Sequence, residues 1–353
     1  MSALIAVLIA DDLTGSLDSI APFAALGANC VTAVSLAAIR PALAHAPEVL
    51  SVNLGTRELL PEQARIRAAS AAGLLRDATG PETVWIKKID SRLKGSIEAE
   101  ISGLFDVLPL ERVLLCPAIP ELGRIVSHGY LRGAGIAQDL HVAELVAVEQ
   151  QCSFPDANNE TDLDRLASSV QPGTLVAAAR GLAAALARRL CPGRPPSPVY
   201  LRHGPIGFAV GSRDPVTLAQ VALLGGKDGP KFTLAPDGEV GPVVDSGSFV
   251  IQSTEGAGAD GSVVSARLAA GVARHVAGLK TLVLSGGETA AAVLDAVGIR
   301  LLRVKGEVLP GLPLCNAADL PGFPDLVTKS GGFGPPDTLL RLWQASQRSE
   351  GYP

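Results

Sequence analysis

Two adjacent acidic residues near the start of the chain could orient or deprotonate a hydroxyl group. Asp11 and Asp12 directly follow an apolar segment, Leu4–Ala10, which predicts a buried strand. Ligands bind at the carboxyl ends of strands in open parallel sheets, so this position favours a functional site. The two carboxylates could hold a magnesium ion, accept a proton or bind substrate hydroxyls. The structural alternative is a helix cap made by Asp12 or Thr14.

A second cluster of charged residues follows the strand predicted at Thr83–Lys88. Its charged and polar members are Lys87, Lys88, Asp90, Ser91, Arg92 and Lys94. Cations around one aspartate could pair with a substrate carboxylate or a transferring phosphoryl group, whereas the alternative is a solvated run of charges. Arg57, after the strand predicted at Val49–Asn53, could converge on the same cleft. The proline-containing loop 117–124 carries one further arginine, Arg124.

Three turns rich in small residues follow predicted strands in the C-terminal half. They are Gly211–Arg213, Ser285–Thr289 and Lys329–Gly334. Glycine allows backbone N–H groups to approach phosphate oxygens, and the helix expected after Gly287 would point its positive end at them. Glycine also serves ordinary turns, but three such turns at equivalent strand ends predict a nucleotide pocket.

Two glycine motifs bear on the type of nucleotide. A Walker-type GxxxxGK[ST] sequence is absent, and a GxGxxG sequence occurs at Gly256, Gly258 and Gly261. The acidic residue that usually binds the ribose in dinucleotide sites is missing, because the next strand ends in Ser285. This pattern favours a tight packing turn between helix and sheet, with a dinucleotide site as the alternative.

Short apolar runs alternate with alanine-rich helical stretches, which predicts βαβ units and a mainly parallel sheet in each half. The predicted strands are Leu4–Ala10, Cys30–Ser35, Val49–Asn53, Thr83–Lys88, Val113–Cys116, Leu175–Ala178, Ile206–Val210, Phe249–Gln252, Thr281–Leu284 and Val327–Lys329. The predicted helices cover about 13–26, 61–78, 96–107, 181–190, 263–277 and 288–297, with two more beginning at Pro215 and Pro336.

The sequence CPGRPPSP at 191–198 can continue neither a helix nor a strand ladder, because four of its residues are prolines. We place a domain boundary there. The predicted domains are residues 1–190 and 199–353, joined by a linker at 191–198. The fold class is therefore α/β, with two α/β domains.

Composition restricts the class of protein. Hydrophobic residues make up 47% of the 353 residues and charged residues 18%, which excludes a disordered or fibrous chain. The net charge of −5 and the 4% of aromatic residues argue against nucleic acid as a partner. No apolar run reaches the ~18 residues that a membrane-spanning helix needs. No Lys or Arg precedes Arg40, so we expect a cytoplasmic protein without membrane attachment; a homo-oligomer is left open.

The cysteines point to neither a disulfide framework nor a zinc site. They are Cys30, Cys116, Cys152, Cys191 and Cys315. Their number is odd and none is in a CxxC spacing, so we expect buried small hydrophobic residues.

Six sequence motifs together resemble the four-carbon acid sugar kinase family, which includes threonate, erythronate and 3-oxo-tetronate kinases. They are ADDLTGSLD at 10–18, KKIDSRLKG at 87–95, PAIPELGR at 117–124, GSRDPVTLAQ at 211–220, SGGETA at 285–290 and KSGGFG at 329–334. The resemblance implies an N-terminal domain that binds the acid sugar and a C-terminal domain that binds ATP, with Mg²⁺. It also implies an active site in the cleft between the two domains.

The resemblance also implies roles for individual residues. It places Asp12, Arg57 and the stretch Lys88–Ser91 at the substrate. With Asp11 and Arg124, which the residues themselves singled out, the expected substrate-binding residues are Asp11, Asp12, Arg57, Lys88, Asp90, Ser91 and Arg124. The expected ATP-binding residues are Ser212, Gly286, Gly287, Glu288, Thr289, Gly331 and Gly332. Phosphoryl transfer often uses a carboxylate to accept the proton, and we expect Asp12 in that role, Asp90 as its rival and Lys88 as the residue that stabilises charge.

The chain departs from the family pattern at three motif positions. Leu17 replaces a small or polar residue, Arg92 replaces the common Thr, and Lys94 replaces Arg. Since Arg92 lies within the substrate motif, a larger or branched keto acid is an alternative substrate. Two other functions stay open at this point: an NAD-dependent dehydrogenase that uses 256–261, and a non-enzymatic sensor of sugar acids or nucleotides.

Overall fold

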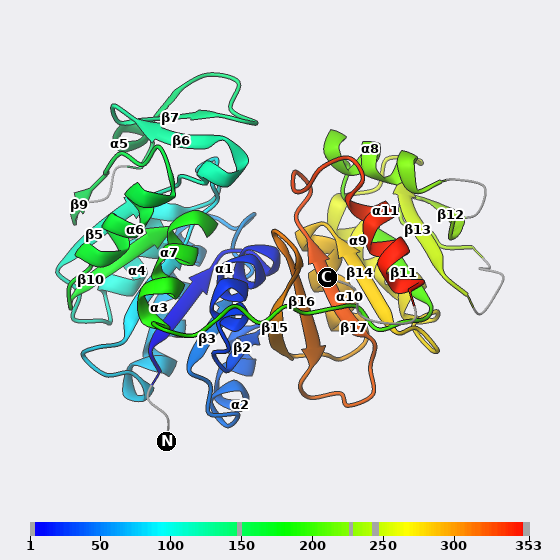
Figure 1. The fold of residues 1–353 in the computed structure, drawn as a ribbon, viewed down its shortest axis with the longest axis horizontal. Coiled ribbons are helices and arrows are strands. Elements are labelled where there is room, and N and C mark those ends of the chain that lie inside the picture. The colour runs from blue at the N-terminus through cyan, green and yellow to red at the C-terminus, as the bar shows by residue number, and fades with distance from the viewer. Residues whose placement is uncertain (1–3, 147–149, 226–228, 242–246, 349–353) are drawn as a thin grey trace. The chain divides into compact units, whose positions relative to one another are not determined.

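The computed structural model describes residues 4–146, 150–225, 229–241 and 247–348. The chain forms two compact units, Met1–Pro196 and Ser197–Pro353, each with its own helices and strands (Figure 1). The division between the units falls within the proline-rich segment; that 191–198 acts as a linker stays a prediction. Across the described ranges, no helix combines the length and the apolar character that crossing a bilayer requires.

The first unit contains a parallel sheet with the strand order β2-β3-β1-β4-β10-β5-β9. The strands are β1 (Ala6–Ala10), β2 (Cys30–Ala33), β3 (Val49–Asn53), β4 (Val84–Lys88), β5 (Arg112–Cys116), β9 (Gln151–Ser153) and β10 (Thr174–Ala178). The central strands β1, β3 and β10 are buried along their whole length. Continuous apolar runs such as AVLIA in β1 suit a sheet whose two faces are both covered.

Helices connect these strands and cover the sheet. They are α1 (Leu13–Ala25), α2 (Ile39–Leu43), α3 (Pro61–Leu75), α4 (Ile97–Phe105), α5 (Val142–Leu145), α6 (Glu160–Ser169) and α7 (Arg180–Leu190). α1 packs against α7, and α3 packs against α4. α1 is itself a core helix, since eleven of its residues are buried.

The strands β3, β1 and β4 end at the same level. Ala10 of β1 is paired with Asn53 of β3 and with Lys88 of β4. The residues that follow these strands therefore emerge side by side at the carboxyl edge of the sheet. In this way three segments that are distant in the sequence contribute to one place.

A small antiparallel sheet in the first unit was not predicted. It consists of β6 (Arg124–Ser127), β7 (Tyr130–Gly133) and β8 (Leu140–His141). At the far end of this pairing the chain passes close to Gly133, the last residue of β7, which has φ +107°; a Cβ there would lie 1.9 Å from the carbonyl oxygen of Gly123. These strands have two to four residues each, which is too short for a hydrophobic period to be recognised.

The second unit has a mixed sheet with the order β12-β13-β11-β14-β17-β16-β15. The strands are β11 (Ile206–Val210), β12 (Lys231–Pro236), β13 (Phe249–Thr254), β14 (Thr281–Ser285), β15 (Leu301–Leu309), β16 (Leu312–Ala317) and β17 (Asp325–Lys329). The neighbouring strands β12, β13, β11, β14 and β17 pair in parallel. β16 pairs antiparallel with both of its neighbours, β17 and β15. The helices are α8 (Pro215–Leu224), α9 (Gly261–Ala273), α10 (Gly287–Ala296) and α11 (Thr338–Ser346).

The α/β class with mainly parallel sheets is confirmed in both units. The hairpin of β15 and β16 was not predicted, because Gly306, Pro310 and Pro313 interrupt its apolar pattern. All five cysteines are free; four are buried, and Cys152 is only partly so.

Candidate active site

Asp12 has the helix-capping role that its sequence context allowed, and its carboxylate also stays accessible. It caps α1: its Oδ1 accepts a hydrogen bond from the backbone N–H of Gly15 at 2.7 Å, and its Oδ2 accepts one from the Thr14 hydroxyl at 2.8 Å. Its side chain nevertheless keeps 22% of its surface exposed, so a ligand can reach it. Gly15 is required at its position, since a Cβ there would lie 2.5 Å from Asp12 Oδ1.

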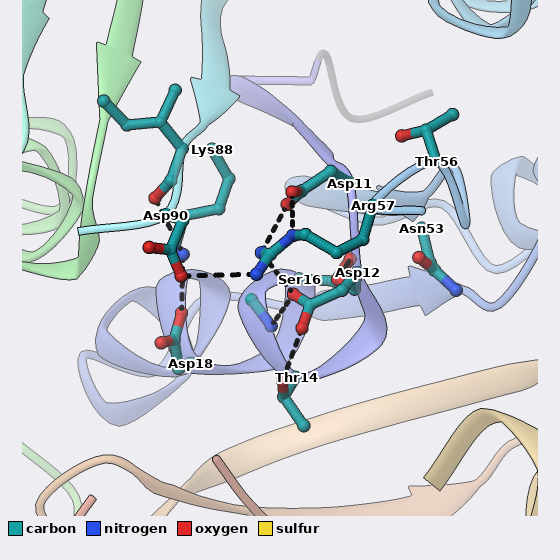
Figure 2. A network of polar contacts seen from close by, with 12 residues as sticks. Asp11, Asp12, Thr14, Ser16, Asp18, Asn53, Thr56, Arg57, Lys88 and Asp90 are labelled. Atoms are coloured by element: carbon teal, nitrogen blue, oxygen red, sulfur yellow. Dashed lines mark hydrogen bonds and ion pairs between the residues drawn. The ribbon is translucent and has the colours of Figure 1, made fainter. Parts of the chain in front are cut away.

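Arg57 lies at the centre of a group of carboxylates (Figure 2). It donates from Nε and Nη2 to the two oxygens of Asp11 and from Nη1 to Asp90 at 3.2 Å, and its Nη2 lies 3.5 Å from Asp12. Burial would raise the pKa of Asp11, but Lys87, Arg57 and Lys88 together hold it below its usual value. The guanidinium is thus already surrounded by three carboxylates, so it joins the loops after β1, β3 and β4.

Lys88 is a buried cation among acidic side chains. Its Nζ lies 3.8 Å from Asp18 of α1 and donates to the backbone carbonyl of Ile89 at 3.1 Å. Burial opposes the charge of Lys88, but Asp18, Asp12, Asp11 and Asp90 raise its pKa above the usual value. Burial raises the pKa of Asp18. Lys88 therefore carries its charge at neutral pH, next to the side chains expected to bind a substrate hydroxyl.

Lys87 points to the opposite side of β4 from Lys88, because successive side chains alternate along a strand. Its Nζ forms a 2.6 Å ion pair with Glu100 of α4, and both side chains are 1% exposed. The hydroxyl of Thr56 donates to the same Glu100. The charged motif had grouped Lys87 with the other cations. In the structure it is instead a buried residue in an ion pair that supports the fold.

Ser91, Arg92 and Arg124 form the more basic side of the site. Arg124 donates from Nη1 to the Ser91 hydroxyl and from Nη2 and Nε to the carbonyl of Ala134 at 2.7 and 3.0 Å. The backbone N–H of Arg92 donates to Asp90 at 2.8 Å. Burial and the charge of Arg92 lower the pKa of Arg124. Among the residues that the structure describes, neither arginine has a carboxylate as an ion-pair partner.

In the second unit, the three small-residue turns lie next to one another. The register aligns Val210 with Ser285 and Ser285 with Lys329, so β11, β14 and β17 end together. The backbone N–H of Ser212 donates to the carbonyl of Ser285 at 3.2 Å, and that of Gly286 donates to the carbonyl of Lys329 at 3.0 Å. The three turns thus form one continuous backbone surface.

Glycine is required where these turns meet. Gly286 has φ +107°, and a Cβ there would lie 3.3 Å from the backbone nitrogen of Ser212. A Cβ on Gly331 would lie 2.6 Å from the Ser212 hydroxyl oxygen. Gly287 begins α10, and Glu288 and Thr289 lie in its first turn. Of the four glycines expected to bind ATP, Gly332 is exposed, whereas Gly286, Gly287 and Gly331 are partly buried.

The GxGxxG segment has a packing role in the structure. It connects β13 to α9, where Gly258 donates its backbone N–H to Asp237 at 3.1 Å. A Cβ on Gly256 would lie 2.6 Å from the carboxylate of Asp237. Asp237 follows the neighbouring strand β12, so these glycines allow a close approach between two connections.

Comparison with known proteins identifies both units. A family model described as a sugar-binding N-terminal domain matches residues 6–138, and one described as a nucleotide-binding C-terminal domain matches residues 242–339. The two matches together cover more than half of the chain. The chain belongs to the four-carbon acid sugar kinase family. The resemblance seen in the six sequence motifs is thereby confirmed.

Members of this family align with nearly the whole chain. The D-threonate kinase of Cupriavidus necator is 27% identical, over 97% of this chain and 98% of its own length. The 3-oxo-tetronate kinase of Methylobacterium radiotolerans is 27% identical, over 94% and 97%. A crystal structure from Salmonella typhimurium LT2 matches with a TM-score of 0.75 at 20% identity, over 95% of this chain and 98% of that chain, which supports the fold alone. These relatives favour a kinase over the NAD-dependent dehydrogenase.

Proposed function

We propose that this protein is an ATP-dependent kinase that phosphorylates a hydroxyl of a four-carbon sugar acid, of the threonate or 3-oxo-tetronate type. The similarity to D-threonate and 3-oxo-tetronate kinases supports this class of reaction. The structural observation that carries the proposal is the set of carboxylates gathered around Arg57 at the carboxyl edge of the first sheet. Such carboxylates accept hydrogen bonds from several hydroxyl groups at once.

The proposed chemistry assigns the hydroxyl end of the substrate to the acidic residues. Asp12 accepts the proton of the attacking hydroxyl, and Asp90, which lies on the other side of Arg57, binds a neighbouring hydroxyl. Lys88 is protonated and stabilises the negative charge that develops during transfer. Asp90 as the base is the rival assignment, and the comparison of two variants in the Discussion distinguishes them.

The substrate carboxylate is assigned to Arg124, Arg92 and Ser91. Arg57 was expected to take this role, but three carboxylates already surround it. Arg124 and Arg92 have no such partner among the described residues, so an incoming carboxylate would be their counter-ion. A charge-assisted hydrogen bond of this kind contributes roughly 1.5–3 kcal/mol.

The phosphates of ATP are assigned to the joined turns of the second unit, through Ser212, Gly286–Thr289 and Gly331–Gly332. Their backbone N–H groups and the N-terminus of α10 favour anionic oxygens. Mg²⁺ is expected with ATP and neutralises phosphate charge during transfer. Among the described residues, no group of three or more His, Cys, Asp or Glu side chains is arranged to hold a metal. Mg²⁺ usually binds through one or two carboxylates and the substrate phosphates, so it does not need a larger group of protein ligands.

Steady-state kinetics on acids and their matching polyols test the proposed function. We expect ADP release that depends on Mg²⁺ and on threonate, erythronate or their 3-oxo forms. The efficiency kcat/KM on threitol and erythritol should be lower by about 10-fold to 10²-fold, because the polyols leave the arginines without a counter-ion. Equal efficiency on acid and polyol would exclude a carboxylate site. Ligand binding without ADP release from any substrate would favour the sensor.

A valine at Gly286 is expected to weaken ATP binding. The Cβ would crowd the backbone nitrogen of Ser212, and the positive φ adds strain. We expect KM for ATP to rise by about 10-fold or more while KM for the acid changes little. Gly278→Val is the matched control, because Gly278 also has a positive φ, +83°, but has open space around it. Similar KM values for ATP in the two variants would show that the nucleotide binds elsewhere.

A further inference from the structure

Lys329 is a fully buried lysine at the end of β17, directly below the third of the joined turns. Its exposed fraction is 0%. Its Nζ donates to the Thr217 hydroxyl at 2.9 Å, to the Ser330 carbonyl at 3.0 Å and to the Gly331 carbonyl at 2.9 Å. All three N–H donors of the ammonium are therefore used, and all three acceptors are neutral.

Side chains from α8 hold the same turn. The Thr217 hydroxyl also donates to the carbonyl of Gly331 at 2.8 Å. The side-chain amide of Gln220 donates to the carbonyls of Phe333, Gly334 and Pro335 at 3.0, 3.1 and 2.9 Å. The position of the Gly331 backbone, and with it the contact to Ser212, thus depends on the ammonium of Lys329 and on one helix.

The surroundings of Lys329 do not neutralise its charge. Among the described residues it has no ion pair, in contrast to Lys87 and Lys88. The charge that acts on it is that of Asp214, the cap of α8. The packed elements β11, β14 and α8 contain no ionisable side chain, and β16 contributes the thiol of Cys315, whose pKa burial raises. The pKa of Lys329 is lowered by burial to about 8.

A buried cation with neutral partners next to a phosphate-binding surface lacks a counter-ion that a ligand can supply. We infer that Lys329 is a positioning residue for the nucleotide: its ammonium fixes the Gly331 turn and attracts the phosphates, so that ATP binding and protonation of Lys329 favour each other. This inference rests on the proposed assignment of ATP to the joined turns. It adds a residue that was not among those expected to bind ATP.

The coupling has a defined sign. Bound phosphates favour the charged ammonium, so the nucleotide complex has a higher lysine pKa than the free protein. Affinity is then greatest below pH 8 and falls as the pH rises through about 8, where the free protein loses the proton. The γ-phosphate, with a second pKa of ~6, is ionised throughout this range. If only the protonated form binds, Kd at pH 9 is about eight times that at pH 7.5.

Isothermal titration calorimetry of the intact protein with a magnesium complex of a non-hydrolysable ATP analogue tests the coupling. Measurements at pH 7.5 and 8.5, in buffers of different ionisation enthalpy, give the number of protons taken up. We expect the uptake to increase with pH, toward about three quarters of a proton at pH 8.5 for a group with a pKa of about 8. Nucleotide binding without proton uptake at pH 8.5 would overturn the inference.

Variants distinguish the charge of Lys329 from its structural role. Lys329→Arg keeps a cation that does not titrate below pH 12, so its nucleotide affinity should no longer depend on pH between 7.5 and 9. Lys329→Met should bind weakly at both pH values, and Lys280→Met, at an exposed lysine before β14, should behave as the unmodified protein. A full pH dependence in Lys329→Arg would contradict the inference. Absence of nucleotide binding by the unmodified protein at pH 7.5 would instead refute the proposed function.

Discussion

Replacing Asp12 with asparagine is expected to lower kcat by about 10²-fold or more, the scale of a lost general base. Asparagine removes the proton acceptor but can still accept the hydrogen bond from Gly15 that caps α1. The variant should therefore fold, and its KM for ATP should change little. Steady-state kinetics with circular dichroism as the folding control measures both effects.

Asp90→Asn is the matched comparison for this variant. Asp90 also contacts Arg57, and its side chain is 17% exposed, close to the 22% of Asp12. If Asp12 is the base and Asp90 binds a hydroxyl, Asp90→Asn should raise KM for the acid more than it lowers kcat. The reverse result, with near-normal kcat in Asp12→Asn and the large loss in Asp90→Asn, would transfer the role of base to Asp90.

Glu100→Gln is expected to destabilise the first unit by about 3–5 kcal/mol, the usual cost of leaving one member of a buried ion pair without its partner. Lys87 and Glu100 are 2.6 Å apart and both 1% exposed, so water cannot replace the lost carboxylate. Urea unfolding should show a lower midpoint with an unchanged slope.

An exposed ion pair provides the control for that measurement. Arg65 and Asp106 are 2.8 Å apart, but their side chains are 47% and 42% exposed. Asp106→Asn should leave the unfolding midpoint nearly unchanged, because exposed pairs are screened by solvent. Equal shifts in the two variants would show that the Lys87–Glu100 pair has no special role in stability.

The sequence allowed prediction of those elements whose hydrophobic repeat or helix cap depends on residues close together in the chain. The strand β1, the Asp12 cap and the start of α8 at Pro215 all depend on residues within a few positions of one another. The sheet formed by β6, β7 and β8 depends instead on close backbone approach at Gly133, which a single sequence does not reveal. The hairpin of β15 and β16 was hidden by its own glycine and prolines.

The sequence allowed the residues of the candidate site to be grouped, but it did not reveal their hydrogen-bond and ion-pair partners. The carboxyl ends of adjacent parallel strands meet at one edge, so the sequence alone allows Asp11, Arg57 and Lys88 to be grouped. Their partners depend on tertiary structure: Asp11 and Arg57 are 46 positions apart. Strand alternation would have separated Lys87 from Lys88, whereas nothing local indicates that Glu100 is the partner of Lys87.

The burial of α1 has a consequence for how substrate preference can diverge among related enzymes. The residues from Leu13 to Ala21 are all buried, so most substitutions near Asp12 would disturb the core before they changed recognition. The segment that carries Arg92 and the small sheet that begins at Arg124 are less constrained, since several of their side chains reach the surface. Evolution, and laboratory selection for a new acid, can therefore act on these loops while the acidic residues of the helix stay unchanged.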